Sequence, residues 1–192
     1  MDEILVLASG SERRQQILRA LGIPFRVVVS AIDESPLRGE SPEELVARLA
    51  RAKAARVAED ETGPVLGADT EVVLDGAVLG KPASPEDARV MLTRLAGRTH
   101  TVVTGVCLLF AGKAYEALGR TTVQLLPLDA EEIARYVETG EPMGKAGGYH
   151  IEGRGAGFVE SVSGSPSNVA GLPAHLVLAL ARKAGLSLGR DG

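Results

Sequence analysis

Apolar and polar positions alternate along the chain in a way that predicts short strands and helices in turn. Residues 4–8 form a continuous apolar run, typical of a buried strand, and Ser9, Gly10 and Ser11 follow it. Apolar residues then recur at helical spacing up to Gly22, which predicts a short helix. The sequence FRVVVS predicts a second strand at 25–30.

Two helix starts stand out in the next part of the chain. Ser41 is followed by Pro42 and Glu44, which predicts a capped helix that continues to about residue 59. Ser84 is followed by a proline and two acidic residues, which predicts another helix through about Leu95.

Residues 64–82 predict a strand, an interruption at 67–70, and a hairpin that turns at Asp75-Gly76. Residues 100–110 and 114–126 are rich in Thr, Val and Leu and predict a second, longer hairpin.

The C-terminal part predicts two more helices. Asp129 caps one that reaches Val137, and the other covers about 174–184, whereas 138–158 is too rich in glycine to be regular. Helices and strands alternate without strict βαβ order, and hairpins occupy the middle. The fold class is therefore α/β, with a mixed sheet flanked by helices.

The overall composition narrows the class of protein. A chain of 192 residues with 45% hydrophobic content suits one domain over 1–192. No apolar run approaches the roughly 20 residues of a membrane span, and no signal peptide pattern precedes the first strand, so we expect a cytoplasmic protein that does not contact membranes. The net charge of −4 and the 3% aromatic content argue against nucleic acid as a partner. Cys107, the single cysteine, is expected to be a small buried hydrophobe.

The first loop carries candidate anion-binding groups. Its backbone N–H groups lie at a predicted helix N-terminus, and the guanidinium groups of Arg13 and Arg14 could fork onto phosphate oxygens. The alternative is a capped helix with solvated arginines. The chain contains neither G-x-x-x-x-G-K-[ST] nor a G-x-G-x-x-G after the first strand, which argues against P-loop and dinucleotide-binding enzymes.

Lysines and carboxylates in other loops suit the same ligand. Lys81 and Lys145 each follow a glycine, so the backbone there can approach an anion closely, while Lys53 on the long helix could equally be solvated. Asp69, expected after a strand end, and Asp33-Glu34, after the second strand, are candidate ligands for Mg²⁺ or Mn²⁺, although Asp33-Glu34 could also be a solvated turn.

Other catalytic chemistries find less support. The three histidines match no zinc spacing, and G-x-S-x-G is absent, which disfavours zinc hydrolases and the serine-hydrolase elbow. Loop N–H groups, arginines, lysines and carboxylates together favour a polyphosphate substrate with a divalent metal.

Seven segments, in order along the chain, resemble the motif set of the Maf family of nucleoside triphosphate pyrophosphatases. They are LASGSERR (7–14), DES (33–35), LARAKA (49–54), GADT (67–70), LGKP (79–82), YVETGEPMGKAGGYHIEG (136–153) and SNVAGLP (167–173). The resemblance implies an elongated α/β fold with a central mixed, twisted sheet and two lobes around a deep cleft, similar to the inosine triphosphate pyrophosphatases. It also implies a metal-dependent hydrolysis of the α–β phosphoanhydride, and a homodimer. The long motif is similar to the branch that acts on dTTP and UTP rather than the one that prefers 7-methyl-GTP.

The resemblance also implies roles for particular residues. Asp69 matches the proton acceptor for the water that attacks the α-phosphorus, or it holds the metal. The positions that match substrate discrimination are Arg13, Thr70 and Glu152. The positions that match the phosphate and metal environment are Ser9, Glu34, Lys53, Lys81 and Lys145. We therefore expect Asp69, Lys53 and Lys81 to be catalytic. Ser9, Arg13, Arg14, Thr70, Lys145 and Glu152 are expected to bind the substrate, and Glu34 and Asp69 to bind the metal.

The sequence departs from the family pattern at two positions. Glu12 replaces a common proline, and it suits a helix start. Glu152 replaces the usual glutamine, and an ionised glutamate only accepts hydrogen bonds, so a base with an exposed amino group, such as cytosine in CTP, becomes an alternative.

Two further functional alternatives remain open. One is a house-cleaning pyrophosphatase for inosine or xanthosine triphosphates. The other is a nucleotide-sensing regulator of septum formation with incidental turnover, since members of the family have been linked to inhibition of septation.

Overall fold

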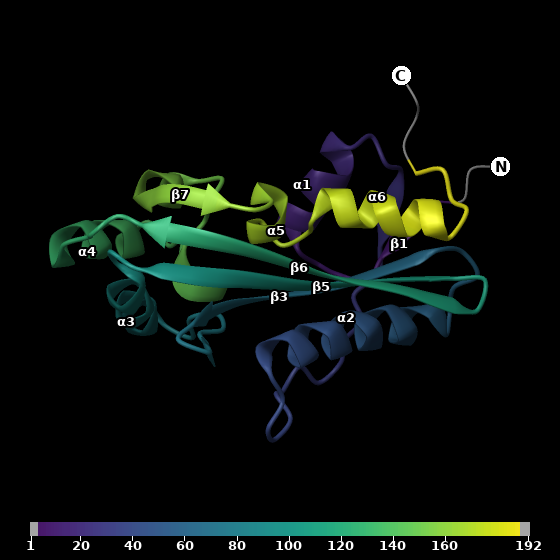
Figure 1. Ribbon diagram of the computed structural model, residues 1–192, viewed down its shortest axis with the longest axis horizontal. Helices are drawn as coiled ribbons and strands as arrows, with labels where there is room; N and C mark the ends of the chain where they lie inside the picture. The colour runs from purple at the N-terminus through teal and green to yellow at the C-terminus, as the bar shows by residue number, and fades with distance from the viewer. Residues whose placement is uncertain (1–3, 189–192) are drawn as a thin grey trace.

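Three long strands form the frame of the molecule. The computed structural model describes residues 4–188. Its strands are β1 (Leu5–Leu7), β2 (Phe25–Val27), β3 (Val65–Leu74), β4 (Ala77–Val78), β5 (Thr99–Phe110), β6 (Lys113–Leu125) and β7 (Val159–Ser163). Its helices are α1 (Glu12–Ala20), α2 (Pro42–Ala58), α3 (Pro85–Leu95), α4 (Ala130–Glu138), α5 (Pro166–Val169) and α6 (Ala174–Lys183), with short 3-10 turns at Ala146–Gly148 and Arg154–Phe158. Figure 1 shows β3, β5 and β6 running along the length of the molecule.

The strands form one sheet of mixed direction. Its order is β2-β1-β3-β5-β6-β7, and β4 pairs with β3 outside that path. The two pairs that β1 makes, with β2 and with β3, are parallel, whereas β5 pairs with β3 and with β6 in antiparallel fashion. This confirms the predicted α/β class with a mixed sheet.

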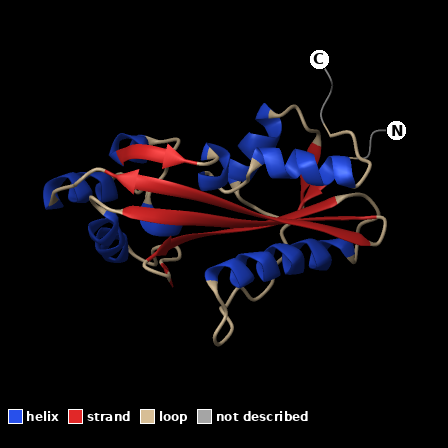
Figure 2. Ribbon diagram, in the orientation of Figure 1, coloured by secondary structure: helices blue, strands red, loops and turns tan. Residues whose placement is uncertain are grey.

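Helices cover both faces of the sheet. The helix α2 packs on one face, and α1, α5 and α6 lie on the other, while α3 and α4 gather at the far end of the long strands (Figures 1 and 2). Buried apolar residues at the β1 end join the sheet to α1, α2 and α6, and a separate cluster at the other end joins it to α3 and α4. The expected two lobes therefore correspond to opposite ends of one sheet.

Local signals predicted most boundaries correctly. Ser41 caps α2 with both bonds of a capping box, and Asp129 caps α4 in the same way. The two hairpins turn at Asp75-Gly76 and Ala111-Gly112, where all four residues have positive φ, as a type I′ turn requires. Cys107 is buried and free, as expected.

The predicted interruption at 67–70 is wrong, because β3 runs through it without a break. Gly67 is required for packing rather than for a turn. A Cβ at this position would lie 2.8 Å from the backbone nitrogen of Ala54 and closer still to the carbonyl oxygen of Ala50, both on α2. Asp69 therefore lies in the middle of a strand and not after its end.

Smaller corrections concern the loops. The second strand ends at Val27 rather than 30, so Asp33 and Glu34 belong to a longer loop. The glycine-rich 138–158 contains the two 3-10 turns, and β7 and α5 were not expected from the pattern.

Titration of His100 should make the stability depend on pH. His100 on β5 is 3% exposed, its Nε2 lies 2.8 Å from the hydroxyl of Tyr149, and burial lowers its pKa from 6.5 to about 4. As the pH falls, the histidine is protonated in the unfolded chain before it is protonated in the folded protein. The free energy of unfolding is therefore highest above pH 6.5. Between pH 6.5 and pH 4 it decreases by at most about 3 kcal/mol.

The matched variant is His100→Gln, which keeps a partner for Tyr149 but does not titrate. We expect the difference in urea midpoint between the two proteins to change between pH 7 and pH 5, with wild type losing more. Parallel pH curves for the two proteins would show that His100 does not contribute.

Candidate active site

A cavity of about 390 Å³ opens where the edge of β3 is not covered by a strand. On that edge β1 pairs only as far as Leu66, and β4 begins to pair at Val73. Among residues 4–188 no strand lies beside this edge of β3 between these two points, whereas β5 covers the other edge throughout. The cavity lies in this gap, between the two lobes.

The cavity brings together all of the predicted site residues except Asp33 and Glu152. Those that line it are Ser9, Arg13, Arg14, Glu34, Lys53, Asp69, Thr70, Lys81 and Lys145. Glu152 does not line it and is exposed, although its charge still acts on Arg13.

Both faces of β3 contribute to the cavity, because its edge is open here. Side chains alternate along a strand, so Asp69 and Glu71 point to the α2 face, whereas Thr70 and Val72 point to the opposite face. All four residues line the cavity. One face therefore supplies carboxylates, and the other supplies a hydroxyl and an apolar surface.

Lys53 and Asp69 form a buried ion pair. Lys53 Nζ lies 2.6 Å from Asp69 Oδ1 and 3.0 Å from Glu34 Oε1. Lys53 and Asp69 are both buried, and Asp69 Oδ2 has no hydrogen-bond partner in the described part of the chain. The lysine thus fixes one oxygen of the carboxylate and leaves the other free for a ligand or a proton.

Arg14 ties the first loop to the sheet. Its Nε donates to the carbonyl of Gly171 at 2.9 Å, one terminal nitrogen donates to Ser9 Oγ at 2.9 Å, and the other reaches Thr70 Oγ1 at 3.4 Å. The side chain is buried, and burial lowers its pKa. Because its nitrogens are occupied by acceptors of the protein, Arg14 holds the wall of the cavity in place.

Arg13, next to it, has a different environment. It is half-buried, and no hydrogen bond or ion pair is found for it within residues 4–188. Burial lowers its pKa, and the charge of Glu152 raises it in part. Arg13 is therefore the arginine with a guanidinium free to bind an anion.

Two loops that carry lysines are joined directly to each other. Gly147 N donates to the carbonyl of Gly80 at 2.8 Å, which ties the loop of Lys145 to the loop of Lys81. Burial and the charge of Arg13 lower the pKa of Lys145. These cations line the same cavity as the carboxylates.

Glu141, which was not predicted from the sequence, organises the segment that leads to Glu152. The hydroxyl of Tyr136 and the backbone nitrogens of Arg154 and Gly155 all donate to its carboxylate, at 2.8 to 3.1 Å. No local pattern indicated this role, because two of the three donors are backbone groups 13 and 14 residues away.

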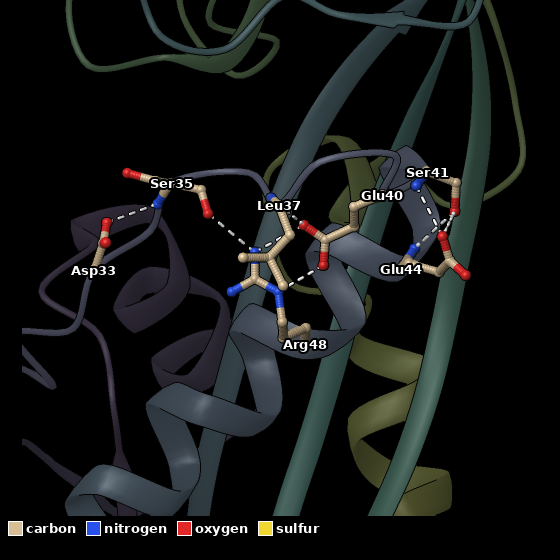
Figure 3. A network of polar contacts seen from close by, with 7 residues as sticks. All are labelled: Asp33, Ser35, Leu37, Glu40, Ser41, Glu44 and Arg48. Carbon is tan, nitrogen blue, oxygen red and sulfur yellow. Dashed lines mark hydrogen bonds and ion pairs between the residues drawn. The ribbon is translucent and has the colours of Figure 1, made fainter.

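The loop that carries Glu34 is fastened to α2. Arg48 donates to both carboxylate oxygens of Glu40 and to the carbonyl of Ser35, and Ser35 N donates to Asp33 (Figure 3). The guanidinium of Arg48 lowers the pKa of Glu40 to about 2. This network fixes the loop on either side of Glu34.

A divalent cation fits the residues present, provided that the substrate supplies ligands. No group of three or more His, Cys, Asp or Glu side chains within residues 4–188 is placed to hold a metal. Two carboxylate oxygens in the cavity, Asp69 Oδ2 and Glu71 Oε2, are buried and have no hydrogen-bond partner among residues 4–188. Mg²⁺ typically binds one or two carboxylates and completes its shell with substrate phosphates and water.

Glu71 was also missed, and for a specific reason. With β3 taken as interrupted at 67–70, the alternation that places Glu71 beside Asp69 could not be seen. A continuous strand would have indicated it.

The model of a protein family described as Maf-like protein matches residues 4–184. A protein from Symbiobacterium thermophilum named dTTP/UTP pyrophosphatase is 53% identical, with 89% of each chain covered. Proteins of the same name from Pelotomaculum thermopropionicum (47% identical; 96% of this chain and 98% of that protein) and Myxococcus xanthus (50% identical; 96% and 94%) are also similar.

Among solved structures, the Ham1 protein of Staphylococcus aureus matches at 16% identity and a TM-score of 0.46, over 64% of this chain and 72% of that one. A nucleoside-triphosphatase / dITP/XTP pyrophosphatase from Mycobacterium abscessus matches at 16% identity and a TM-score of 0.42, over 65% and 74%. No helix within residues 4–188 is long and apolar enough to cross a membrane.

Proposed function

The chain belongs to the Maf family, and from this premise we propose that it hydrolyses dTTP and UTP to the monophosphate and pyrophosphate. The hydrolytic chemistry in this proposal depends on one observation. A buried carboxylate, Asp69, has one oxygen fixed by Lys53 and the other free, in a cavity lined by further cations.

We propose that Asp69 acts through Oδ2, which accepts the proton of the attacking water or holds the metal. Its Oδ1 is held by Lys53, so the carboxylate cannot rotate freely, and Oδ2 remains the oxygen that can face the attacking water. Arg13, Lys81 and Lys145 would offset the charge that develops on the phosphate oxygens and the leaving pyrophosphate. Such preorganised charge usually contributes more than any other effect to this type of catalysis.

The remaining predicted residues position these groups or contact the base. Arg14 and Ser9 hold the first loop, and Thr70 presents its hydroxyl on the opposite face of β3. A bound Mg²⁺ or Mn²⁺ would supply a Lewis acid that polarises the phosphoryl oxygens. Asp69 and Glu34 are its predicted ligands, and both carboxylates contact the ammonium of Lys53.

Three further predictions accompany this proposal. We propose that residues 1–192 form a single domain and that the protein acts in the cytoplasm, where it would meet nucleoside triphosphates. The homodimer implied by the family resemblance stays a prediction.

The test is a hydrolysis screen. Purified protein is incubated with canonical and modified triphosphates, with Mg²⁺, with Mn²⁺ or with EDTA, and pyrophosphate and monophosphate are both measured. We expect dTTP and UTP to give equimolar monophosphate and pyrophosphate, and EDTA to stop the reaction. Preference for inosine or xanthosine triphosphate would favour the purine alternative, and absence of turnover on every substrate would favour a regulator.

Base preference is expected to depend on residue 152. Glu152 only accepts hydrogen bonds, whereas glutamine also donates, so Glu152→Gln should raise kcat/KM for dTTP and UTP relative to CTP by about tenfold. Steady-state rates for the three nucleotides with both proteins provide the measurement. Identical ratios in the two proteins would remove residue 152, which does not line the cavity, from base selection.

A further inference from the structure

Glu71 is a half-buried acid to which the roles assigned above give no function. It follows Asp69 by two residues on β3, so both side chains leave the strand on the α2 face and line the same cavity. Its Oε2 is buried, and no hydrogen-bond partner is found for it in the described part of the chain.

The fold alone gives no reason for an acid at this position. A carboxylate buried without a partner is destabilising, whereas a β-branched residue would suit a strand interior. Asp69, two residues earlier, brings a second carboxylate to the same cavity, and a bound cation would reduce the repulsion between the two like charges.

A second observation, made on Asp69, also indicates that a ligand binds here. It is 6% exposed, and its Oδ2 is unpartnered among the described residues, in a cavity shared with Glu71. Two carboxylate oxygens on one strand face, without partners among the described residues, can provide some of the ligands of a hard cation. The substrate would provide the remaining oxygens.

We propose that Glu71 is a ligand of the divalent cation that enters with the nucleotide, beside Asp69. The inference rests on the proposed function, because the triphosphate supplies the remaining oxygens. It assigns the α2 face of β3 to the metal and leaves the Thr70 face to the rest of the nucleotide.

The experiment measures Mn²⁺ binding directly and without turnover. The probe is Mn²⁺, followed by electron paramagnetic resonance, with a UTP analogue whose α–β bridging oxygen is replaced by a methylene group. We expect wild type to bind Mn²⁺ in the presence of the analogue, and Glu71→Gln to weaken Mn²⁺ binding by about tenfold or more.

Two variants serve as comparisons. Asp75→Asn makes the same change of charge on the hairpin that follows β3, at an exposed residue that keeps its positive φ as asparagine, and Mn²⁺ binding should not change. Glu71→Val removes every oxygen from the side chain in a residue suited to a strand, and it should weaken Mn²⁺ binding at least as much as glutamine does.

The outcomes separate the two proposals. Mn²⁺ binding by Glu71→Gln equal to wild type overturns the assignment of Glu71, as does wild type that binds no Mn²⁺ beside the analogue. The hydrolysis screen on wild type is scored independently. If wild type hydrolyses dTTP and UTP but Glu71→Gln binds Mn²⁺ as well as wild type does, only the role of Glu71 is wrong. If wild type hydrolyses neither nucleotide, the proposed function is wrong.

Discussion

Asp69→Asn is expected to lower kcat for dTTP by about 10³-fold or more while the protein remains folded. Asparagine has the shape of aspartate and keeps an oxygen that can accept the bond from Lys53, which lies 2.6 Å from Oδ1 in the native protein. The asparagine side chain cannot accept a proton from water near neutral pH, and it binds a divalent cation less strongly than aspartate does. The rate should therefore fall through chemistry and not through loss of the cavity.

Stability must be measured beside the rate, because Lys53 is buried. The substitution would leave the ammonium with Glu34, 3.0 Å away, as its only paired carboxylate within residues 4–188, and removing one partner of a buried pair can cost about 3 kcal/mol. Urea unfolding shows whether the variant is folded under assay conditions. Asp75→Asn, at the exposed turn after β3, is the matched control and should retain full activity. A folded Asp69→Asn protein that turns over dTTP at nearly the wild-type rate would show that Asp69 is not the proton acceptor.

Local signals in the sequence were sufficient for most helices and hairpins. The cap at Ser41, the cap at Asp129 and the turn at Asp75-Gly76 each depend on contacts within a few residues, so spacing alone identifies them. The β7 strand, in contrast, depends on pairing with β6, and the segment 159–163 shows no local pattern that requires it.

Most residues of the candidate site were predicted from the sequence, but their geometry was not. Asp69 was selected because it was expected after a strand end, yet it lies inside β3 and reaches the cavity because the neighbouring edge is open. The missed residues depend on tertiary structure. Glu71 needed a continuous strand to be recognised, and Glu141 needed the fold that brings Tyr136 and Gly155 to it.

The two adjacent arginines of the first motif have different environments. Arg13 and Arg14 were expected to bind phosphate together, but the structure buries Arg14 among protein acceptors and leaves Arg13 free of them in the described residues. Helical spacing explains the difference, since successive residues point about 100° apart on a helix. Whether Arg14 also contacts the substrate stays a prediction.

Gly67→Ala is expected to destabilise the fold by about 3 kcal/mol, a large share of the stability of a typical domain. The added Cβ would lie 2.8 Å from Ala54 N and closer to Ala50 O, and these are backbone atoms of α2 that cannot rotate away. The helix must therefore move off the sheet. Lys53 lies on the same turn of α2, so the displacement would also separate it from Asp69 and lower the activity of the molecules that remain folded.

Gly157→Ala is the matched control for the change from glycine to alanine. Gly157 is exposed, and a Cβ there would meet nothing within 4 Å. Its unfolding free energy should change by no more than about 0.5 kcal/mol, and any increase would come from the restriction that alanine places on the unfolded chain. Urea midpoints for the two variants at one pH provide the comparison. If Gly67→Ala unfolds at the same urea concentration as Gly157→Ala, then α2 does not depend on close contact with β3, and the glycine would have no packing role. The close approach of Lys53 to Asp69 would then need another cause.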